Sequence, residues 1–312
     1  MSEMNRPLVS IITPCYNGER FVKRYFDCIL AQTYSPLELI FINDGSTDHT
    51  EEIALSYRER LEQKGIRYIY EYQENTGQAA ALNRGLKLFT GEYLTWPDSD
   101  DVMTPDCIEK KVKFLELNSG YGLCICKSYL VNENEPKKII GILERVPPVG
   151  EDNFFDDLIF IKNVYFTPGG YMVRSDAFLK AIPDREIYAG RGGQNLQMLL
   201  PVLRSYKCGY MQEILNYYYE SSQSHSHSIV TTVQKAKQIE LYEQIILETL
   251  YRIDPALNQE YKQKVLHYFG KWLFGIAIDA GDKKAMKKYY IQLKCNGKVS
   301  LKERLLYLKK CL

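Results

Sequence analysis

The sequence lacks the long apolar stretches that membrane-spanning helices need. Its longest candidate runs from Trp272 to Ile278, far short of the roughly 18 apolar residues that signal a transmembrane helix. The first seven residues carry no apolar signal region before a strand-like segment begins. These absences argue against a secreted or membrane-spanning protein.

Cysteine occurs eight times, but not with the spacing of a metal site or of a redox pair. No two cysteines stand as C-x-x-C. Several lie in apolar runs, where a free cysteine behaves as a small hydrophobic side chain. We therefore expect a reduced, cytoplasmic protein.

Net charge is also small, at +1, but it is unevenly distributed. Residues 283–312 hold ten Lys or Arg and one acid, so this tail carries +9 against −8 for the rest. Within it, leucines recur on one helix face at Leu301, Leu305, Leu308 and Leu312. That pattern suits peripheral docking on an anionic membrane, or else a packed helical cap or homodimer element with a solvated basic face. No nucleic-acid motif accompanies the lysines, and the acidic body argues against nucleic acid as a partner.

The first half of the chain alternates strand and helix signals. Strand-like runs cover 8–13, 37–42, 66–72 and 91–96, with helical patterns between them. This alternation predicts an α/β fold with a mixed, mainly parallel sheet flanked by helices. From about residue 229 onward every signal is helical, so we expect one domain over 1–228 and a C-terminal helical region over 229–312.

Polar side chains follow three of these strands. Pro14 to Asn17, Asn43-Asp44 and Asp98 to Asp101 come where strands end, and ligands of parallel sheets bind beyond the carboxyl ends. The last segment places three carboxylates within four residues, and like charges at this density call for a compensating cation. Oxygen ligands suit Mg²⁺ or Mn²⁺. An acidic surface turn is the simpler explanation for the triplet alone.

At this point a resemblance to a known family emerges. Residues 9–19 (VSIITPCYNGE), 32–34 (QTY), 38–48 (ELIFINDGSTD) and 98–101 (DSDD) are similar, in order and spacing, to family 2 glycosyltransferases of the GT-A, Rossmann-like fold. The similarity covers about residues 7–225 and is most specific over the first 105.

The resemblance implies a nucleotide-diphosphate sugar donor, with UDP the first choice, and inversion at the anomeric carbon. It also implies a Mn²⁺ or Mg²⁺ ion and a glycan or lipid-linked acceptor in surface polysaccharide synthesis. The positions that match donor-binding residues of the family are Pro14, Tyr16, Glu19, Asp44, Gln78, Asp98 and Asp100. Asp100 and Asp101 match carboxylates that handle the diphosphate and metal, with Asp101 the direct ligand.

The chain departs from the family on the acceptor side. The family places a Glu-Asp pair, which supplies the catalytic base, after a glycine at a helix start, and here Gln194-Asn195 stands in its place. Amides can orient an acceptor but cannot take its proton near neutral pH. Either another residue is the base, with Asp184 and Glu186 the nearest upstream acids, or the acceptor is already ionised, or the protein binds donor without efficient transfer.

Two alternatives stay open. His225 and His227 follow the last expected strand, where a histidine can approach the metal, although a polar Ser-rich linker explains them equally well. The amide pair also makes a non-catalytic sugar-nucleotide-binding protein an alternative to an enzyme. A nucleotidyltransferase is disfavoured because no Gly- and basic-rich phosphate loop follows the first strand.

Overall fold

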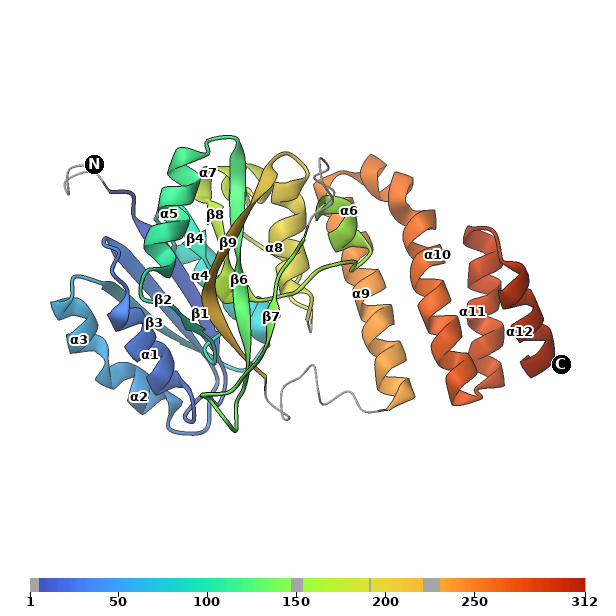
Figure 1. Ribbon diagram of the computed structural model, residues 1–312, viewed down its shortest axis with the longest axis horizontal. Coiled ribbons are helices and arrows are strands. Elements are labelled where there is room, and N and C mark those ends of the chain that lie inside the picture. The colour runs from blue at the N-terminus through green and yellow to red at the C-terminus, as the bar shows by residue number, and fades with distance from the viewer. Residues whose placement is uncertain (1–5, 147–153, 191, 221–230, 312) are drawn as a thin grey trace. The chain divides into compact units, whose positions relative to one another are not determined.

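A computed structural model describes residues 6–146, 154–190, 192–220 and 231–311 (Figure 1). The chain forms two compact units. The first, which we call the sheet unit, holds residues 1–157 and 163–221, and the second, the helical unit, holds 158–162 and 222–312. The predicted domain boundary at 228/229 lies outside the described residues.

The first half of the sheet unit follows the expected βα alternation. Its elements are β1 (Val9–Cys15), α1 (Val22–Ala31), β2 (Leu37–Asp44), α2 (Thr50–Ser56), α3 (Arg58–Gln63), β3 (Arg67–Gln73), α4 (Gln78–Leu88) and β4 (Tyr93–Thr95). β1 pairs in parallel with β2 on one side and β4 on the other, and β2 pairs in parallel with β3. β1 and β2 are buried along their whole length, which explains their nearly continuous apolar sequence.

The second half completes a mixed sheet. Its elements are β5 (Val102–Met103), α5 (Cys107–Leu117), β6 (Tyr121–Asn132), β7 (Ile139–Leu143), α6 (Phe154–Ile159), β8 (Tyr171–Arg174), α7 (Ser175–Ala181), α8 (Gln194–Leu203) and β9 (Lys207–Glu220). The strand order is β3-β2-β1-β4-β8-β6-β9-β5, with β7 on β6. The predicted fold class is therefore confirmed. β9 runs continuously from Lys207 to Glu220, although Gln212 and Glu213 interrupt its apolar pattern.

Helices cover both faces of this sheet (Figure 1). On one face, Phe26 of α1 lies 5.1 Å from Phe41 of β2 and stacks on Tyr57 at 4.9 Å, ring centroid to centroid. On the other face α4 approaches β1 so closely that a Cβ on Gly85 would meet Ile12 at 2.3 Å. Only glycine fits this contact, and it lets the second half of α4 pack directly on β1.

The helical unit consists of long antiparallel helices: α9 (Thr232–Ile253), α10 (Pro255–Ala280), α11 (Lys283–Asn296) and α12 (Leu301–Cys311). Its core gathers Leu273, Phe274 and Leu293 with smaller contributions around them. A capping box begins α12, since Ser300 and Glu303 exchange side-chain-to-backbone hydrogen bonds. Among the described helices, none combines the length and hydropathy that a membrane crossing requires.

Candidate functional site

The carboxyl ends of three neighbouring strands form the candidate site. β1 lies between β2 and β4, so Cys15, Asp44 and the segment after Thr95 meet at one edge of the sheet. The side chains of Cys15 and Ser99 form a hydrogen bond, which joins the end of β1 to the acidic segment. The structure therefore brings together the three segments that the sequence placed at strand ends.

Asp44 closes β2 and holds the turn that leads into α4. Its Oδ1 accepts from Gln73 Nε2 at 2.7 Å and from the Thr76 N–H at 3.1 Å, and its Oδ2 accepts from the Gly77 N–H at 3.0 Å. The carboxylate is buried, and Oδ2 keeps one acceptor position unused by these bonds. Sequence reasoning gave Asp44 a role in binding but missed this local role in positioning α4.

The β1–α1 loop presents Tyr16 and ties Glu19 down. The Tyr16 side chain is 50% exposed, so a ring face is available to a ligand. Glu19 Oε2 accepts from the His49 N–H at 3.1 Å, and Asn17 Oδ1 accepts from the Thr47 N–H at 2.9 Å. Glu19 thus joins two loops at the site edge, while Pro14 is buried within β1.

The acidic segment forms a compact cluster. One ligand oxygen from each of Asp98, Asp100 and Asp101 lies within 4.8 Å of the others. Asp101 is almost fully buried, and its Oδ1 accepts from the Tyr219 N–H at 3.2 Å. Its Oδ2 is buried without a hydrogen-bond partner among the residues that the structure describes. A buried carboxylate oxygen without a partner is costly, and its position suggests a ligand that supplies the missing charge.

Burial and mutual repulsion keep this cluster electrostatically strained. Burial, followed by repulsion from Asp100, raises the pKa of Asp98 to about 7. Burial, followed by repulsion from Asp100 and Asp98, raises the pKa of Asp101 well above its ordinary value. A bound divalent cation would relieve both penalties, and three carboxylates are the hard oxygen donors that Mg²⁺ or Mn²⁺ prefers. The residues present therefore fit such an ion.

Arg24 of α1 is a cation beside this cluster that sequence reasoning missed. Its Nη2 donates to the Asp100 carbonyl at 2.6 Å, and its guanidinium lies 3.6 Å from the centroid of the Tyr219 ring. The attraction of Arg24 lowers the pKa of Asp100, although burial outweighs it and raises that pKa overall. No sequence signal marks this residue, because it approaches the cluster from a helix 76 positions earlier.

The amide pair that begins α8 is bonded to the acidic segment. Gln194 Nε2 donates to Gln78 Oε1 at 2.7 Å, and Gln78 Nε2 donates to Asp98 Oδ1 at 2.6 Å. Asn195 Oδ1 accepts from the buried Trp96 indole N–H at 2.8 Å. Gly193 precedes the helix with φ +69°, a left-handed conformation that favours glycine. The residues predicted to orient an acceptor thus lie beside the predicted donor and metal residues.

The two candidate bases are not brought to the cluster. Lys87 Nζ lies 3.5 Å from Glu186 Oε2 and also donates to the Asp184 carbonyl. Lys87 is nine residues after Gln78 on α4, which is about 13 Å along the helix axis. A base role for Asp184 or Glu186 stays a prediction. His225 and His227 lie outside the described residues.

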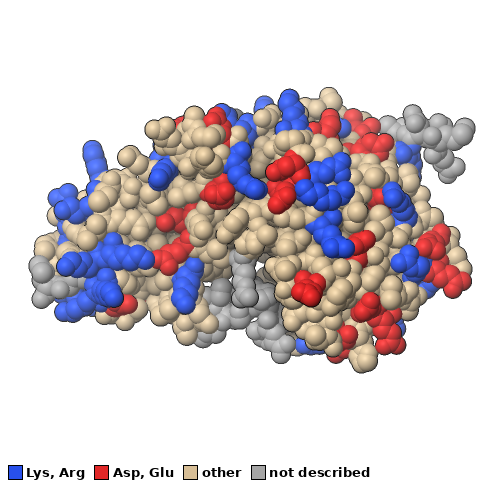
Figure 2. All heavy atoms as spheres, turned by 180° about the vertical axis from the view of Figure 1, so that it is seen from behind, with Lys and Arg blue, Asp and Glu red and all other residues tan. Residues whose placement is uncertain are grey.

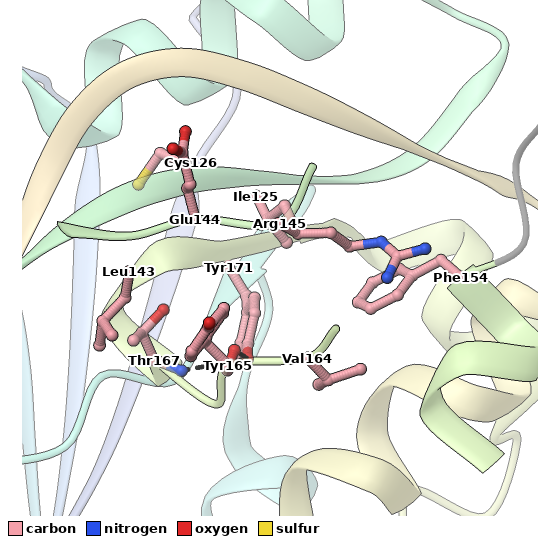
Figure 3. A pocket seen from close by; sticks show the side chains of 10 residues that line it. All are labelled: Ile125, Cys126, Leu143, Glu144, Arg145, Phe154, Val164, Tyr165, Thr167 and Tyr171. Carbon is pink, nitrogen blue, oxygen red and sulfur yellow. Dashed lines mark hydrogen bonds between the residues drawn. The ribbon is translucent and has the colours of Figure 1, made fainter. Parts of the chain in front are cut away.

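A small, partly open cavity in the sheet unit is a separate feature (Figure 3). It measures about 10 Å³, which is space for roughly one water molecule, so it cannot hold a nucleotide. The Arg145 side chain extends toward the Phe154 ring at its rim, with the guanidinium 4.5 Å from the ring centroid. Arg145 Nη1 also lies 2.7 Å from Asp157 Oδ2 in a buried ion pair. We assign this cavity a structural role.

Comparison with known proteins gives a consistent result. The family described as "Glycosyl transferase family 2" matches residues 10–180. An uncharacterized glycosyltransferase of Rickettsia typhi is 46% identical over 128 residues, which are 41% of this chain and 38% of the relative. Glycosyltransferase GlyA of Streptococcus pneumoniae is 32% identical over 162 residues, 51% of this chain and 22% of the relative. The chain therefore spans well under half of the length of these relatives.

Two solved structures share the fold. Staphylococcus aureus TarS 1–349 in complex with UDP-GlcNAc superposes with a TM-score of 0.62 at 17% identity, covering 97% of this chain and 79% of that one. The mannosyltransferase PcManGT of Pyrobaculum calidifontis, in complex with GDP-Man and Mn²⁺, gives 0.55 at 17% identity, covering 98% and 85%. At this identity the likeness establishes the fold alone.

Proposed function

Because the chain belongs to glycosyl transferase family 2, we propose that it transfers one sugar from a nucleotide-diphosphate donor to a glycan or lipid-linked acceptor. We propose inversion at the anomeric carbon, a UDP-sugar donor and a role in surface polysaccharide synthesis. The observation that carries the proposal is the acidic cluster at the strand ends, with its unpartnered Asp101 Oδ2. Binding of UDP-GlcNAc by TarS and of GDP-Man with Mn²⁺ by PcManGT supports the donor class.

On this proposal each donor-side residue has a distinct part. The exposed Tyr16 ring stacks on the nucleobase, and the free acceptor position of Asp44 Oδ2 takes the base N–H. Pro14 and Glu19 shape the loop that carries Tyr16, and Gln78 fixes Asp98. Asp100 and Asp101 hold Mn²⁺ or Mg²⁺, which would offset the charge that builds up on the leaving diphosphate.

Gln194 and Asn195 are the proposed residues on the acceptor side of the site. Gln194 and Asn195 orient the acceptor but cannot remove a proton near neutral pH. The acceptor is then an already ionised group, such as a phosphate, or a base comes from elsewhere, with Asp184 and Glu186 as the proposed residues. The same amides support the alternative of a sugar-nucleotide-binding protein that does not turn over.

A donor screen tests this function. We expect UDP-sugars with Mn²⁺ to raise the unfolding temperature more than GDP- or dTDP-sugars, and nucleotide without metal to have little effect. Release of the nucleotide diphosphate in the presence of acceptor would establish an enzyme. Binding without any release would establish the non-catalytic alternative, and a protein that responds to no sugar nucleotide would contradict both.

We further propose that the chain works at the cytoplasmic face of a membrane, bound peripherally through residues 283–312. On α12 the side chains of Leu301, Leu305 and Leu308 are 73%, 57% and 51% exposed. Leu312 lies outside the described residues. Lys and Arg gather over the end of the helical unit that carries α11 and α12 (Figure 2). Exposed leucines beside lysines suit an anionic bilayer, where each basic residue contributes about 1 kcal/mol near the surface.

Vesicle binding measures this contact. We expect the protein to sediment with vesicles that contain anionic phospholipid at low salt, and not with pure phosphatidylcholine. Leu305→Glu should lower the bound fraction about tenfold, because it removes one inserted side chain and adds a negative charge. Leu117→Glu, at a leucine of α5 that is even more exposed, is the control. Equal binding by the two variants would contradict the proposed face.

A further inference from the structure

β7 is an apolar strand with an open edge. Its five residues, Ile139 to Leu143, include no charge, and among the described strands it pairs with β6 alone. Ile139, Ile140 and Ile142 are 51%, 43% and 51% exposed. An edge strand offers a row of unpaired N–H and C=O groups to another chain, and charges normally protect it. β7 carries no charge along its length, and the one irregularity in its pairing with β6 is a register shift that skips Ile140.

The edge of the sheet formed by β3 differs from β7 because it carries charged side chains. β3 ends the strand order and also has one open side, but it carries Arg67 and Glu71. Arg67 Nη1 lies 2.7 Å from Glu38 Oε2, and Glu71 pairs with Arg84. These charges disfavour the pairing of another strand at that edge. The lack of charged side chains is thus a property of β7 and is not shared by β3.

The charges on either side of β7 match those of a second copy of the same strand. The segment from Lys138 to Glu144 reads Lys-Ile-Ile-Gly-Ile-Leu-Glu, with a cation before the strand and an anion after it. When two copies of this segment run antiparallel about Gly141, Lys138 of each lies opposite Glu144 of the other. Ile139 then faces Leu143, and Ile140 faces Ile142. Charge and apolar pattern are therefore self-complementary in one register.

From this pattern we propose that two copies of the chain associate through β7, forming one continuous sheet across a twofold axis centred on Gly141. The interface is isologous, so both Lys138–Glu144 contacts form at once. A five-residue strand pair buries less surface than a standard protein interface, so the dimer is weak and forms as concentration rises. The proposal does not depend on transferase activity.

Both flanking charges have partners within their own chain. Lys138 Nζ lies 3.0 Å from Glu135 Oε2, and Glu144 Oε2 lies 2.6 Å from Lys127 Nζ. Reversing either charge disrupts these internal pairs as well as the proposed contact. An experiment must therefore separate the two effects, and a charge exchange between chains does so.

Sedimentation equilibrium of the full chain and its charge-reversed variants tests the proposal. We expect the unaltered chain to dimerise reversibly in the micromolar range. Lys138→Glu places like charges opposite each other twice per dimer, as does Glu144→Lys, so each variant alone should associate about tenfold more weakly. An equimolar mixture of the two variants restores opposite charges at both contacts, and the mixed dimer should recover the original affinity.

Mixing does not restore the internal pair that each variant has lost, so recovery in the mixture can come only from contact between chains. Lys113→Glu, at an exposed lysine of α5, makes the same change in net charge as Lys138→Glu and should leave association unaltered. Circular dichroism of each variant confirms that the fold is kept. A chain that stays monomeric at all concentrations, a dimer that ignores both reversals, or a mixture no tighter than its components would overturn the proposal.

Discussion

Replacing Asp101 by asparagine is expected to stabilise the metal-free protein and to lower metal-dependent sugar transfer by about a hundredfold or more. The amide oxygen can still accept from the Tyr219 N–H, so the link to β9 survives. The amide nitrogen takes the position of the unpartnered Oδ2 and can donate to the neighbouring carboxylates. Removing a buried, repelled charge should add about 1–2 kcal/mol to the free energy of unfolding.

Thermal unfolding with and without Mn²⁺ measures both halves of this prediction. The variant should unfold at a higher temperature than the unaltered chain when no metal is added, and should gain less from Mn²⁺. Asp279→Asn, at an exposed acid of α10 in the helical unit, removes the same charge outside the unit that holds the cluster and serves as the control. A loss of stability in the metal-free variant would show that Asp101 is structural, and an undiminished Mn²⁺ response would exclude it as a ligand. The opposed effects are typical of functional sites, where activity costs stability.

Replacing Trp96 by alanine should destabilise the sheet unit by about 3–5 kcal/mol, the usual cost of deleting a buried aromatic side chain. The indole is almost fully buried, its ring lies 5.8 Å from the Tyr171 ring, and its N–H bonds Asn195. Trp96→Phe keeps much of the apolar volume but leaves Asn195 Oδ1 without its donor, so we expect a smaller loss of about 1–3 kcal/mol. The difference between the variants separates packing from the hydrogen bond.

Urea unfolding followed by circular dichroism gives these free energies. Trp272→Phe is the matched control, since Trp272 is the only other tryptophan and is partly exposed on α10. We expect that control to change stability by less than about 1 kcal/mol. If Trp96→Phe proved neutral, the bond to Asn195 would contribute nothing, and α8 would be positioned by packing alone.

The sequence predicted which strand ends meet at this site better than it predicted the contacts that support them. Tyr16, Asp44 and Asp98 each follow a strand with a clear apolar pattern, and parallel strands align their ends. By contrast, the Trp96–Asn195 bond joins residues 99 positions apart, and the Asp101–Tyr219 bond spans 118. Local periodicity contains no information about such distant pairs, because they arise only when the sheet is assembled.

The later strands were harder to predict for a related reason. β5 has only two residues, too few for any alternation to be recognised, and it exists because β9 pairs with it. The open edge of β7 was equally invisible, since five apolar residues read the same whether a sheet covers them or not. Exposure is a property of the assembled fold.

The amide chain at the site has a direction that its chemistry imposes. An ionised Asp98 can only accept, so Gln78 then turns its nitrogen toward it and its oxygen toward Gln194. Gln194 then donates an N–H to Gln78, and its own carbonyl oxygen has no hydrogen-bond partner among the residues that the structure describes. The indole N–H of Trp96 can only donate, so it bonds the side-chain oxygen of Asn195. The N–H groups of that amide then remain to donate to a ligand. The two neighbouring amides thus offer opposite hydrogen-bonding groups to a ligand: Gln194 offers an acceptor and Asn195 offers a donor. A hydroxyl group can both donate to the first and accept from the second.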